Sequence, residues 1–265
     1  MIGSLTRNPV LFAMRLSGYG PRTPHCNEPE PDNMSHSGPR PHAHLPSAAA
    51  VFLALMAATI MPVFAGPAPV TITMFGDSLT AGYLLPPGHA IPDRLNEAVA
   101  ASGAADVKIV NAGVSGDTTT DGLSRLDWAI GPETDGVILE LGANDGLRGI
   151  DPALTGKNLE AIIVALQKRG IPVMLAGMLA PPNLGPDYGK EFNAIFPGLA
   201  KKYGLLYIPF FMAGVLPDEH SRLTIDGMHP NDDGVAIVVS RLLPTVKDFI
   251  AEVRKAKASR TASPQ

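Results

Sequence analysis

The feature that most constrains the fold is the alternation of short apolar segments with longer amphipathic ones. Five segments rich in β-branched and aliphatic residues are typical of buried strands: 70–75, 107–110, 136–141, 172–176 and 205–208. Helical periodicity marks five others: 92–101, 118–126, 151–168, 189–203 and 234–253. Strands and helices that alternate in this way form a parallel sheet with helices on both faces. The sequence therefore predicts an α/β protein with a five-stranded parallel sheet.

The first 65 residues differ in composition from this alternating region. Segment 27–46 is polar, rich in proline and without periodicity, which predicts disorder. It precedes 17 apolar, uncharged residues, 48–64, which is the short limit for a membrane-spanning helix. Small residues around Ala65 fit a signal-peptidase site. We interpret residues 1–65 as a disordered leader plus signal peptide, with an uncleaved N-terminal anchor as the alternative.

Further expectations follow from that interpretation. Met34 lies close to the apolar run, with Arg40 as the flanking positive charge, so translation is expected to start at Met34. The mature protein is expected to be exported, periplasmic or secreted, with no stable membrane span after processing. Residues 66–254 then form a single domain, and the polar tail 255–265 is expected to fray.

Composition excludes several classes of function. The 21 basic and 25 acidic residues give a net charge of −4 without basic runs, so we expect no nucleic-acid partner. The single cysteine, Cys26, rules out a disulfide framework within the chain and any Cys-rich zinc or iron–sulfur site. We expect neither a metal nor a cofactor.

The loops that follow the strands are the places to search for chemistry, because ligands bind beyond the carboxyl ends of parallel strands. The first of these loops contains Gly76-Asp77-Ser78-Leu79. A serine at a strand-to-helix turn has an exposed hydroxyl near a helix N-terminus, which suits a nucleophile. Taken alone, such a serine is more often a helix N-cap. The loop lacks the glycine patterns of nucleotide-binding loops.

A nucleophilic serine needs a base, and the histidines that follow the leader are His89, His220 and His229. The first two lie in polar or Pro/Gly-rich loops and are expected to be solvated. His229 follows Asp226 across a glycine, so the carboxylate can accept a bond from Nδ1–H and leave Nε2 to face Ser78. The alternative is a metal site, which would lack a second histidine. Its ligands would be Asp226, His229, Asp232 and Asp233.

Acyl transfer also needs hydrogen-bond donors for the tetrahedral oxyanion, and the next two strand-end loops offer them. Segment 111–117 contains Gly116, whose backbone N–H is approachable, and segment 142–146 offers the side-chain amide of Asn144. In isolation both segments would be ordinary turns, since Asn, Asp and Gly are turn residues. Their position at successive strand ends beside Ser78 favours the functional interpretation.

Four blocks thus follow one another in the chain: Gly76-Asp77-Ser78-Leu79, Gly116, Gly142-Ala143-Asn144-Asp145 and Asp226-Gly227-Met228-His229. In order and spacing they resemble the SGNH (GDSL) hydrolases. Over about residues 69–250 the chain is similar to that family's bacterial multifunctional thioesterase/arylesterase/lysophospholipase branch. The resemblance implies a flavodoxin-like three-layer α/β/α sandwich. It also implies the site residues: Ser78 as nucleophile, His229 as general base, Asp226 as orienting acid, and the Ser78 and Gly116 N–H groups with the Asn144 side chain as oxyanion donors.

Loop 178–189 departs from the pattern of these relatives. It holds three prolines and is slightly longer than the mobile loop with which relatives select acyl chains. We interpret it either as a stiff surface connection or as a lid in which Leu184 and Tyr188 contact the acyl group.

We therefore expect a monomeric serine hydrolase whose partner is a small-molecule ester. Aryl esters and short- to medium-chain acyl esters are the expected substrates, with thioesters and lysophospholipids sharing the same chemistry. Export favours carboxylic esters and lysophospholipids, because acyl-CoA is cytosolic. One alternative is a carbohydrate O-acetylesterase, although a chain whose single tryptophan is Trp128 has few aromatics for a sugar platform. The other is a non-enzymatic flavodoxin-like binding module.

Overall fold

The structure is a computed structural model that describes residues 69–217 and 222–262. The predicted leader and signal peptide, the Met34 start and His220 lie outside the described residues. Within the described ranges, no helix is both long enough and apolar enough to cross a membrane.

A five-stranded parallel sheet forms the centre of the described domain, in the order β2-β1-β3-β4-β5. Its strands are β1 (Val70–Gly76), β2 (Val107–Gly113), β3 (Gly136–Glu140), β4 (Val173–Ala176) and β5 (Leu206–Ile208). This order is that of flavodoxin-like doubly wound folds, whose ligands bind where the strand order reverses, between β1 and β3. The predicted parallel sheet is confirmed.

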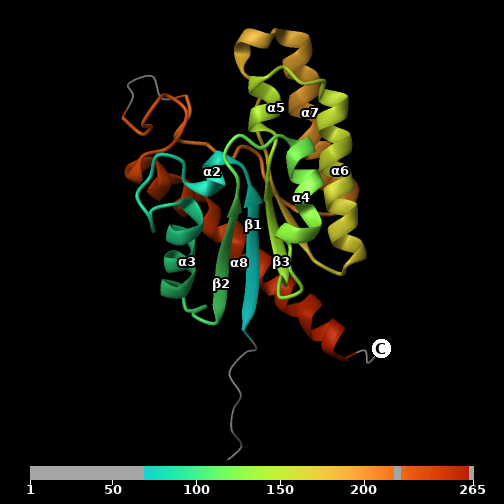
Figure 1. The fold of residues 1–265 in the computed structure, drawn as a ribbon. Coiled ribbons are helices and arrows are strands. Elements are labelled where there is room, and N and C mark those ends of the chain that lie inside the picture. Colours follow the sequence, from blue (N-terminus) through green and yellow to red (C-terminus); the bar gives the residue numbers. More distant parts are fainter. Residues whose placement is uncertain (1–68, 218–221, 263–265) are drawn as a thin grey trace, which may run out of the picture. The chain divides into compact units, whose positions relative to one another are not determined.

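Helices cover both faces of the sheet (Figure 1). On one face α3 (Ile91–Ala101) packs against α8 (Asp232–Ala262). The other face is covered by α4 (Thr119–Ala129), α6 (Pro152–Lys168) and α7 (Pro186–Tyr203). The strand-end loops contain the short helices α2 (Ser78–Ala81), α5 (Ala143–Leu147) and the 3₁₀ helix η1 (Pro182–Leu184). The expected three-layer α/β/α sandwich is therefore present.

Burial explains why the central strands have nearly continuous apolar sequences. Every residue of β3 and of β4 is buried, as expected for parallel strands that are covered on both faces. Phe192 and Phe196 of α7 and Phe249 of α8 are among the largest fully buried side chains. Burial of each phenyl ring contributes about 2–3 kcal/mol.

Two expectations about the ends of elements are wrong. The second strand continues past residue 110 to Gly113, because these residues pair in register with β1 as far as Gly76. The tail does not fray from residue 255, since α8 continues to Ala262. Lys257 and Arg260 hold this last part of the helix to the domain: they pair with the buried Asp135 at 2.6 and 3.1 Å.

Candidate active site

Ser78 is the first residue of α2 and lies directly beyond the carboxyl end of β1. Asp77 caps this helix, because its Oδ1 accepts the N–H of Leu79 at 3.0 Å. The turn is tightly packed: a Cβ on Gly76 would lie 2.2 Å from Oγ1 of Thr80 and 2.4 Å from Oε2 of Glu140. Glycine is therefore required at position 76 for the chain to turn here and present the Ser78 hydroxyl.

Ser78, His229 and Asp226 form a continuous hydrogen-bonded chain. Oγ of Ser78 is 2.9 Å from Nε2 of His229, and Nδ1 of the same ring is 2.7 Å from Oδ2 of Asp226. Oδ1 of Asp226 accepts the backbone N–H groups of His229 and Met228 at 2.8 and 3.0 Å. These bonds fix the imidazole ring with Nδ1–H toward the carboxylate. In that tautomer Nε2 can accept the proton of Ser78.

The charge of Asp226 is set by these contacts. Partial burial alone would raise its pKa, but the hydrogen bonds from His229 and Met228 together outweigh burial and lower the pKa to about 2. Asp226 is therefore ionised at neutral pH and can stabilise a positive charge on His229. The ring of Tyr83 lies 4.8 Å from the imidazole, centroid to centroid, and packs beside it.

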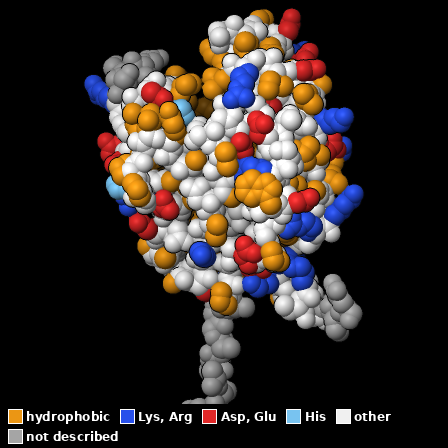
Figure 2. Space-filling model, in the orientation of Figure 1, with side chains coloured by type: hydrophobic (Ala, Val, Ile, Leu, Met, Phe, Trp, Pro, Cys, Tyr) orange, Lys and Arg blue, Asp and Glu red, His pale blue; other side chains and the backbone are white. Residues whose placement is uncertain are grey.

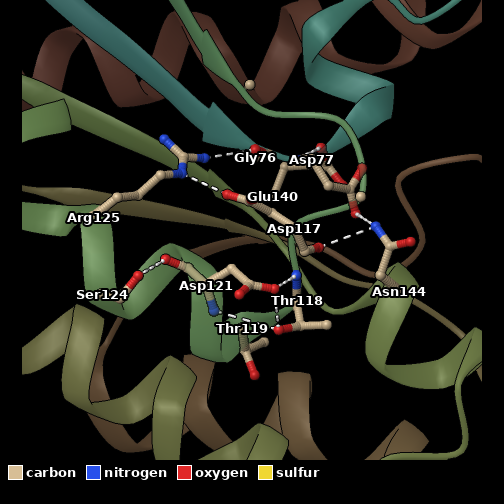
Figure 3. A network of polar contacts seen from close by, with 12 residues as sticks. Gly76, Asp77, Asp117, Thr118, Thr119, Asp121, Ser124, Arg125, Glu140 and Asn144 are labelled. Atoms are coloured by element: carbon tan, nitrogen blue, oxygen red, sulfur yellow. Dashed lines mark hydrogen bonds and ion pairs between the residues drawn. The ribbon is translucent and has the colours of Figure 1, made fainter.

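Gly116 and Asn144 border the same hollow as Ser78. Gly116 follows β2 and has φ +89°, a backbone conformation that favours glycine. Asn144 lies in α5 after β3, and its Nδ2 donates to the carbonyl oxygen of Asp117 at 3.0 Å. A longer contact of 3.3 Å joins Nδ2 to Oδ2 of Asp77 (Figure 3). The ends of β1, β2 and β3 thus bring Ser78, Gly116 and Asn144 to one edge of the sheet. His229 and Asp226 reach the same edge from the segment between β5 and α8.

Two buried carboxyl groups lie beneath the Ser78 turn, those of Asp77 and Glu140. Oε2 of Glu140 accepts the hydroxyl of Thr80 at 2.6 Å and the N–H of Asp77 at 3.3 Å. Burial, with the neighbouring Asp77 carboxylate, raises the pKa of Glu140 well above its usual range. Burial also raises the pKa of Asp77, to about 6, although the N–H of Leu79 acts in the opposite direction. Sequence reasoning missed Glu140, for which the available signal was a glutamate within an apolar strand.

A cavity of about 830 Å³ opens beside Ser78. Figure 2 shows it as a notch at the top of the view, with hydrophobic side chains on both of its walls. The lining is mainly apolar and includes Tyr83, Leu147, Leu179, Pro182, Phe210 and Met212. A cavity of this size and composition suits an apolar group attached to a polar reacting centre.

Leu184 and Tyr188 are not among the residues that line this cavity, contrary to the lid hypothesis. The helix after the loop begins at Pro186, earlier than predicted, so Tyr188 belongs to α7 and stacks on Phe192 one turn further on. Its hydroxyl donates to the carbonyl oxygen of Ile150 at 2.9 Å. The loop residues that do border the cavity are its first five, from Met178 to Pro182.

His89 is not simply solvated, as the sequence had suggested. Its Nδ1 lies 2.6 Å from Oδ1 of Asp232 and 3.2 Å from Nη2 of Arg94. Asp232 thus pairs with His89 while Asp226 pairs with His229, so the carboxylates of the alternative metal site face different histidines. In residues 69–217 and 222–262, no three His, Cys, Asp or Glu side chains converge as a metal site.

Fold and site together define a flavodoxin-like α/β protein of the serine-hydrolase class, with serine, histidine and aspartate aligned at the switch point of a parallel sheet. The chain belongs to the GDSL-like Lipase/Acylhydrolase family, which residues 74–237 match. The predicted family is therefore confirmed.

Named relatives agree with this assignment. The chain is 35% identical over 182 residues to an arylesterase of Vibrio mimicus, covering 68% of this chain and 86% of the relative. It is 36% identical over 192 residues to thioesterase 1/protease 1/lysophospholipase L1 of Escherichia coli (strain K12), covering 72% and 90%. The crystal structure of AlinE4, an SGNH-hydrolase family esterase, is similar with a TM-score of 0.57 and 43% identity, covering 68% of this chain and 96% of that one.

Proposed function

We propose that this chain is a serine esterase that hydrolyses carboxylic esters through an acyl-enzyme on Ser78. The observation that carries the proposal is the aligned pair of contacts, 2.9 Å from Ser78 Oγ to His229 Nε2 and 2.7 Å from His229 Nδ1 to Asp226. Membership of an acylhydrolase family supports the reaction class.

The proposed reaction has two halves, each with His229 as the proton carrier. Oγ of Ser78 attacks the carbonyl carbon of the ester while Nε2 of His229 takes the hydroxyl proton, and Asp226 stabilises the resulting imidazolium. Collapse of the tetrahedral intermediate breaks the bond to the leaving group, which receives that proton. Water then attacks the acyl-enzyme with His229 again as base, which releases the acid and restores Ser78.

Three donors are assigned to the oxyanion of each tetrahedral intermediate: the N–H groups of Ser78 and Gly116 and the side-chain amide of Asn144. The N–H of a first helical residue has no partner within its helix, which leaves that of Ser78 available. The 3.0 Å bond to the Asp117 carbonyl oxygen uses one hydrogen of the Asn144 amide and orients the group. The second hydrogen makes only the longer 3.3 Å contact with Asp77, and we assign this hydrogen to the oxyanion. One such donor lowers the barrier by about 3–4 kcal/mol.

The lining of the cavity supports an ester with an apolar acyl or aryl group. Aryl esters and short- to medium-chain acyl esters are the proposed substrates, and the name of the Vibrio mimicus arylesterase supports the aryl esters. The name of the Escherichia coli relative supports thioesters and lysophospholipids as further substrates. The mainly apolar walls give less support to the carbohydrate O-acetylesterase alternative.

A panel of p-nitrophenyl esters from acetate to decanoate, assayed with wild-type protein and Ser78→Ala, tests the proposal. The variant should lose about 10⁴–10⁶ in kcat on every ester that the wild type hydrolyses. Near-normal hydrolysis by Ser78→Ala would reject Ser78 as the nucleophile.

Export of the enzyme is a further part of the proposal, supported by the apolar segment 48–64 and the small residues after it. The N-terminus of the mature protein is then expected at Gly66. Cell fractionation followed by N-terminal sequencing tests this, with an intact leader on the active enzyme as the contrary result. We also propose that the enzyme is monomeric, which light scattering of the purified protein tests through its molar mass.

A further inference from the structure

A buried ion pair between Arg125 and Asp117 lies next to the proposed site but is not used by the mechanism above. Arg125 of α4 is 6% exposed and Asp117 is 8% exposed. Nε of Arg125 lies 2.5 Å from Oδ2 of Asp117, and the guanidinium carbon is 4.1 Å from the centre of the Phe75 ring. Because desolvation offsets much of the attraction in a buried pair, net stabilisation alone is a weak reason for its presence.

The contacts of this guanidinium reach the ends of two strands. Nη2 of Arg125 donates to the carbonyl oxygen of Gly76, the last residue of β1 and two positions before Ser78. Nε holds the side chain of Asp117 in the loop after β2 (Figure 3). Arg125 therefore fixes the spacing between the Ser78 turn and the loop that contains Gly116.

Asp117 extends this connection to the end of a third strand. Its carbonyl oxygen accepts the Nδ2–H of Asn144 at 3.0 Å, which sets the direction of the amide. Asp117 also directly follows Gly116 in the chain, so a shift of its backbone moves the Gly116 N–H as well. One buried cation is thus linked through short, defined contacts to each of the three assigned oxyanion donors.

We propose that Arg125 is a positioning residue that aims these donors at the oxyanion, acting through Asp117 and the Gly76 carbonyl. The inference rests on the proposed function. It requires arginine rather than lysine, because the planar guanidinium points Nε and Nη2 at two separate acceptors in a fixed fork. A lysine ammonium is a single point of charge on a flexible chain. Donors in such a site must be held to within about 0.5 Å to be effective.

Arg125→Lys is the direct test, measured as kcat and KM on p-nitrophenyl butyrate. Rates are expressed per active site, titrated by fluorophosphonate labelling carried to completion. We expect kcat to fall about 10- to 100-fold while KM changes less than about twofold, since the donors act on the transition state. Affinity for a trifluoromethyl ketone, which forms a reversible tetrahedral adduct with a serine, should fall in parallel.

Arg254→Lys is the matched control. Nη2 of Arg254 also pairs with one aspartate, Asp106, at 2.7 Å to both oxygens. That pair lies at the start of β2, the opposite end of the sheet from Ser78. Its kcat per titrated site should stay within about twofold of wild type.

A double substitution separates positioning from a general loss of order. In an Asn144→Ala background the Arg125→Lys substitution should cost less in kcat than it does in the wild-type background, because one of the three donors that it positions is already absent. If the kcat loss of the double variant equals the product of the losses in Arg125→Lys and Asn144→Ala, the proposal is overturned. A lower melting temperature with unchanged kcat per titrated site would overturn it as well.

Asp117→Asn provides a second route if Arg125→Lys does not fold, because it removes the charge but keeps the shape and the backbone carbonyl. The same fall in kcat and the same non-additivity with Asn144→Ala are expected of it. Failure of the proposed function is recognised separately, by hydrolysis that survives in Ser78→Ala. Loss of hydrolysis in Ser78→Ala with normal kcat in both Arg125→Lys and Asp117→Asn would overturn the positioning role alone.

Discussion

Replacement of Asp226 by asparagine tests how His229 is held. The two side chains have the same shape. The retained oxygen can still accept the N–H groups of His229 and Met228, which lie 2.8 and 3.0 Å from Oδ1 of Asp226 in the structure. The change is confined to the atom that faces Nδ1, where an NH₂ donor replaces the carboxylate oxygen at 2.7 Å. An imidazole that accepts at Nδ1 carries its proton on Nε2, where it cannot take the proton of Ser78.

The expected loss in kcat/KM at pH 7 is about 10³–10⁴-fold, since the same tautomer change costs about 10⁴ in another Ser-His-Asp enzyme. This corresponds to about 4–5.5 kcal/mol of transition-state stabilisation. The lower part of the range applies because the Asp226 side chain is 33% exposed, so that solvent screens part of its charge.

The assay is the initial rate of p-nitrophenyl butyrate hydrolysis, with thermal unfolding to show that the variant is folded. Asp232→Asn is the matched control, because Oδ1 of Asp232 makes the same kind of contact with Nδ1 of His89, at 2.6 Å, away from Ser78. Its kcat/KM should change less than about twofold. A loss below tenfold for Asp226→Asn, or equal losses in the two variants, would refute the reasoning.

Asn144→Ala is expected to lower kcat by about 10²–10³ with little change in KM, and an effect on KM alone would contradict an oxyanion role. For Glu140 the folded-state pKa is raised, so the unfolded chain ionises first and the free energy of unfolding falls as pH rises above about 4. Urea unfolding followed by circular dichroism from pH 4 to 8 should show a shallower fall in the free energy of unfolding for Glu140→Gln than for the wild type. Parallel profiles for the two proteins would contradict a neutral Glu140 carboxyl in the folded state. Truncation after Arg254 removes both cations that pair with Asp135. This truncation should lower the free energy of unfolding by about 2 kcal/mol, which is less than for a fully buried pair because both cations are partly exposed. A change near zero would show that the two ion pairs with Asp135 do not hold the end of the helix.

The sheet was predictable because its signals are local. Buried parallel strands are apolar at nearly every position, and the expected segments 70–75 and 136–141 each differ from the observed strand by one residue. The cap at Asp151 with Pro152 after it marked the start of α6 correctly. By contrast, α2 and α5 are a single turn each and contain weak helix formers, so the surrounding contacts rather than periodicity create them.

The side chains that meet at Ser78 were predictable because few histidines follow the leader and one of them has an aspartate three residues earlier. The contacts that hold these side chains in place were not predictable. Arg125 is one charged residue on an amphipathic helix, and nothing local indicates that Gly76, 49 positions earlier, accepts its hydrogen bond. The surroundings of Tyr188 were not predictable, because the periodicity indicates a helix only from residue 189, whereas α7 begins at Pro186 and includes Tyr188 in its first turn. As a helical residue Tyr188 packs on Phe192, four positions further on, instead of lying in the loop.

The most direct test of the central claim is mass spectrometry of the protein after reaction with a fluorophosphonate. An acyl-enzyme mechanism on Ser78 predicts one adduct per chain, located on the peptide that contains Ser78, with hydrolysis lost in proportion to labelling. His229→Ala should label far more slowly, because the base that activates Ser78 is absent. An adduct on another residue, or full hydrolysis by completely labelled protein, would contradict the account.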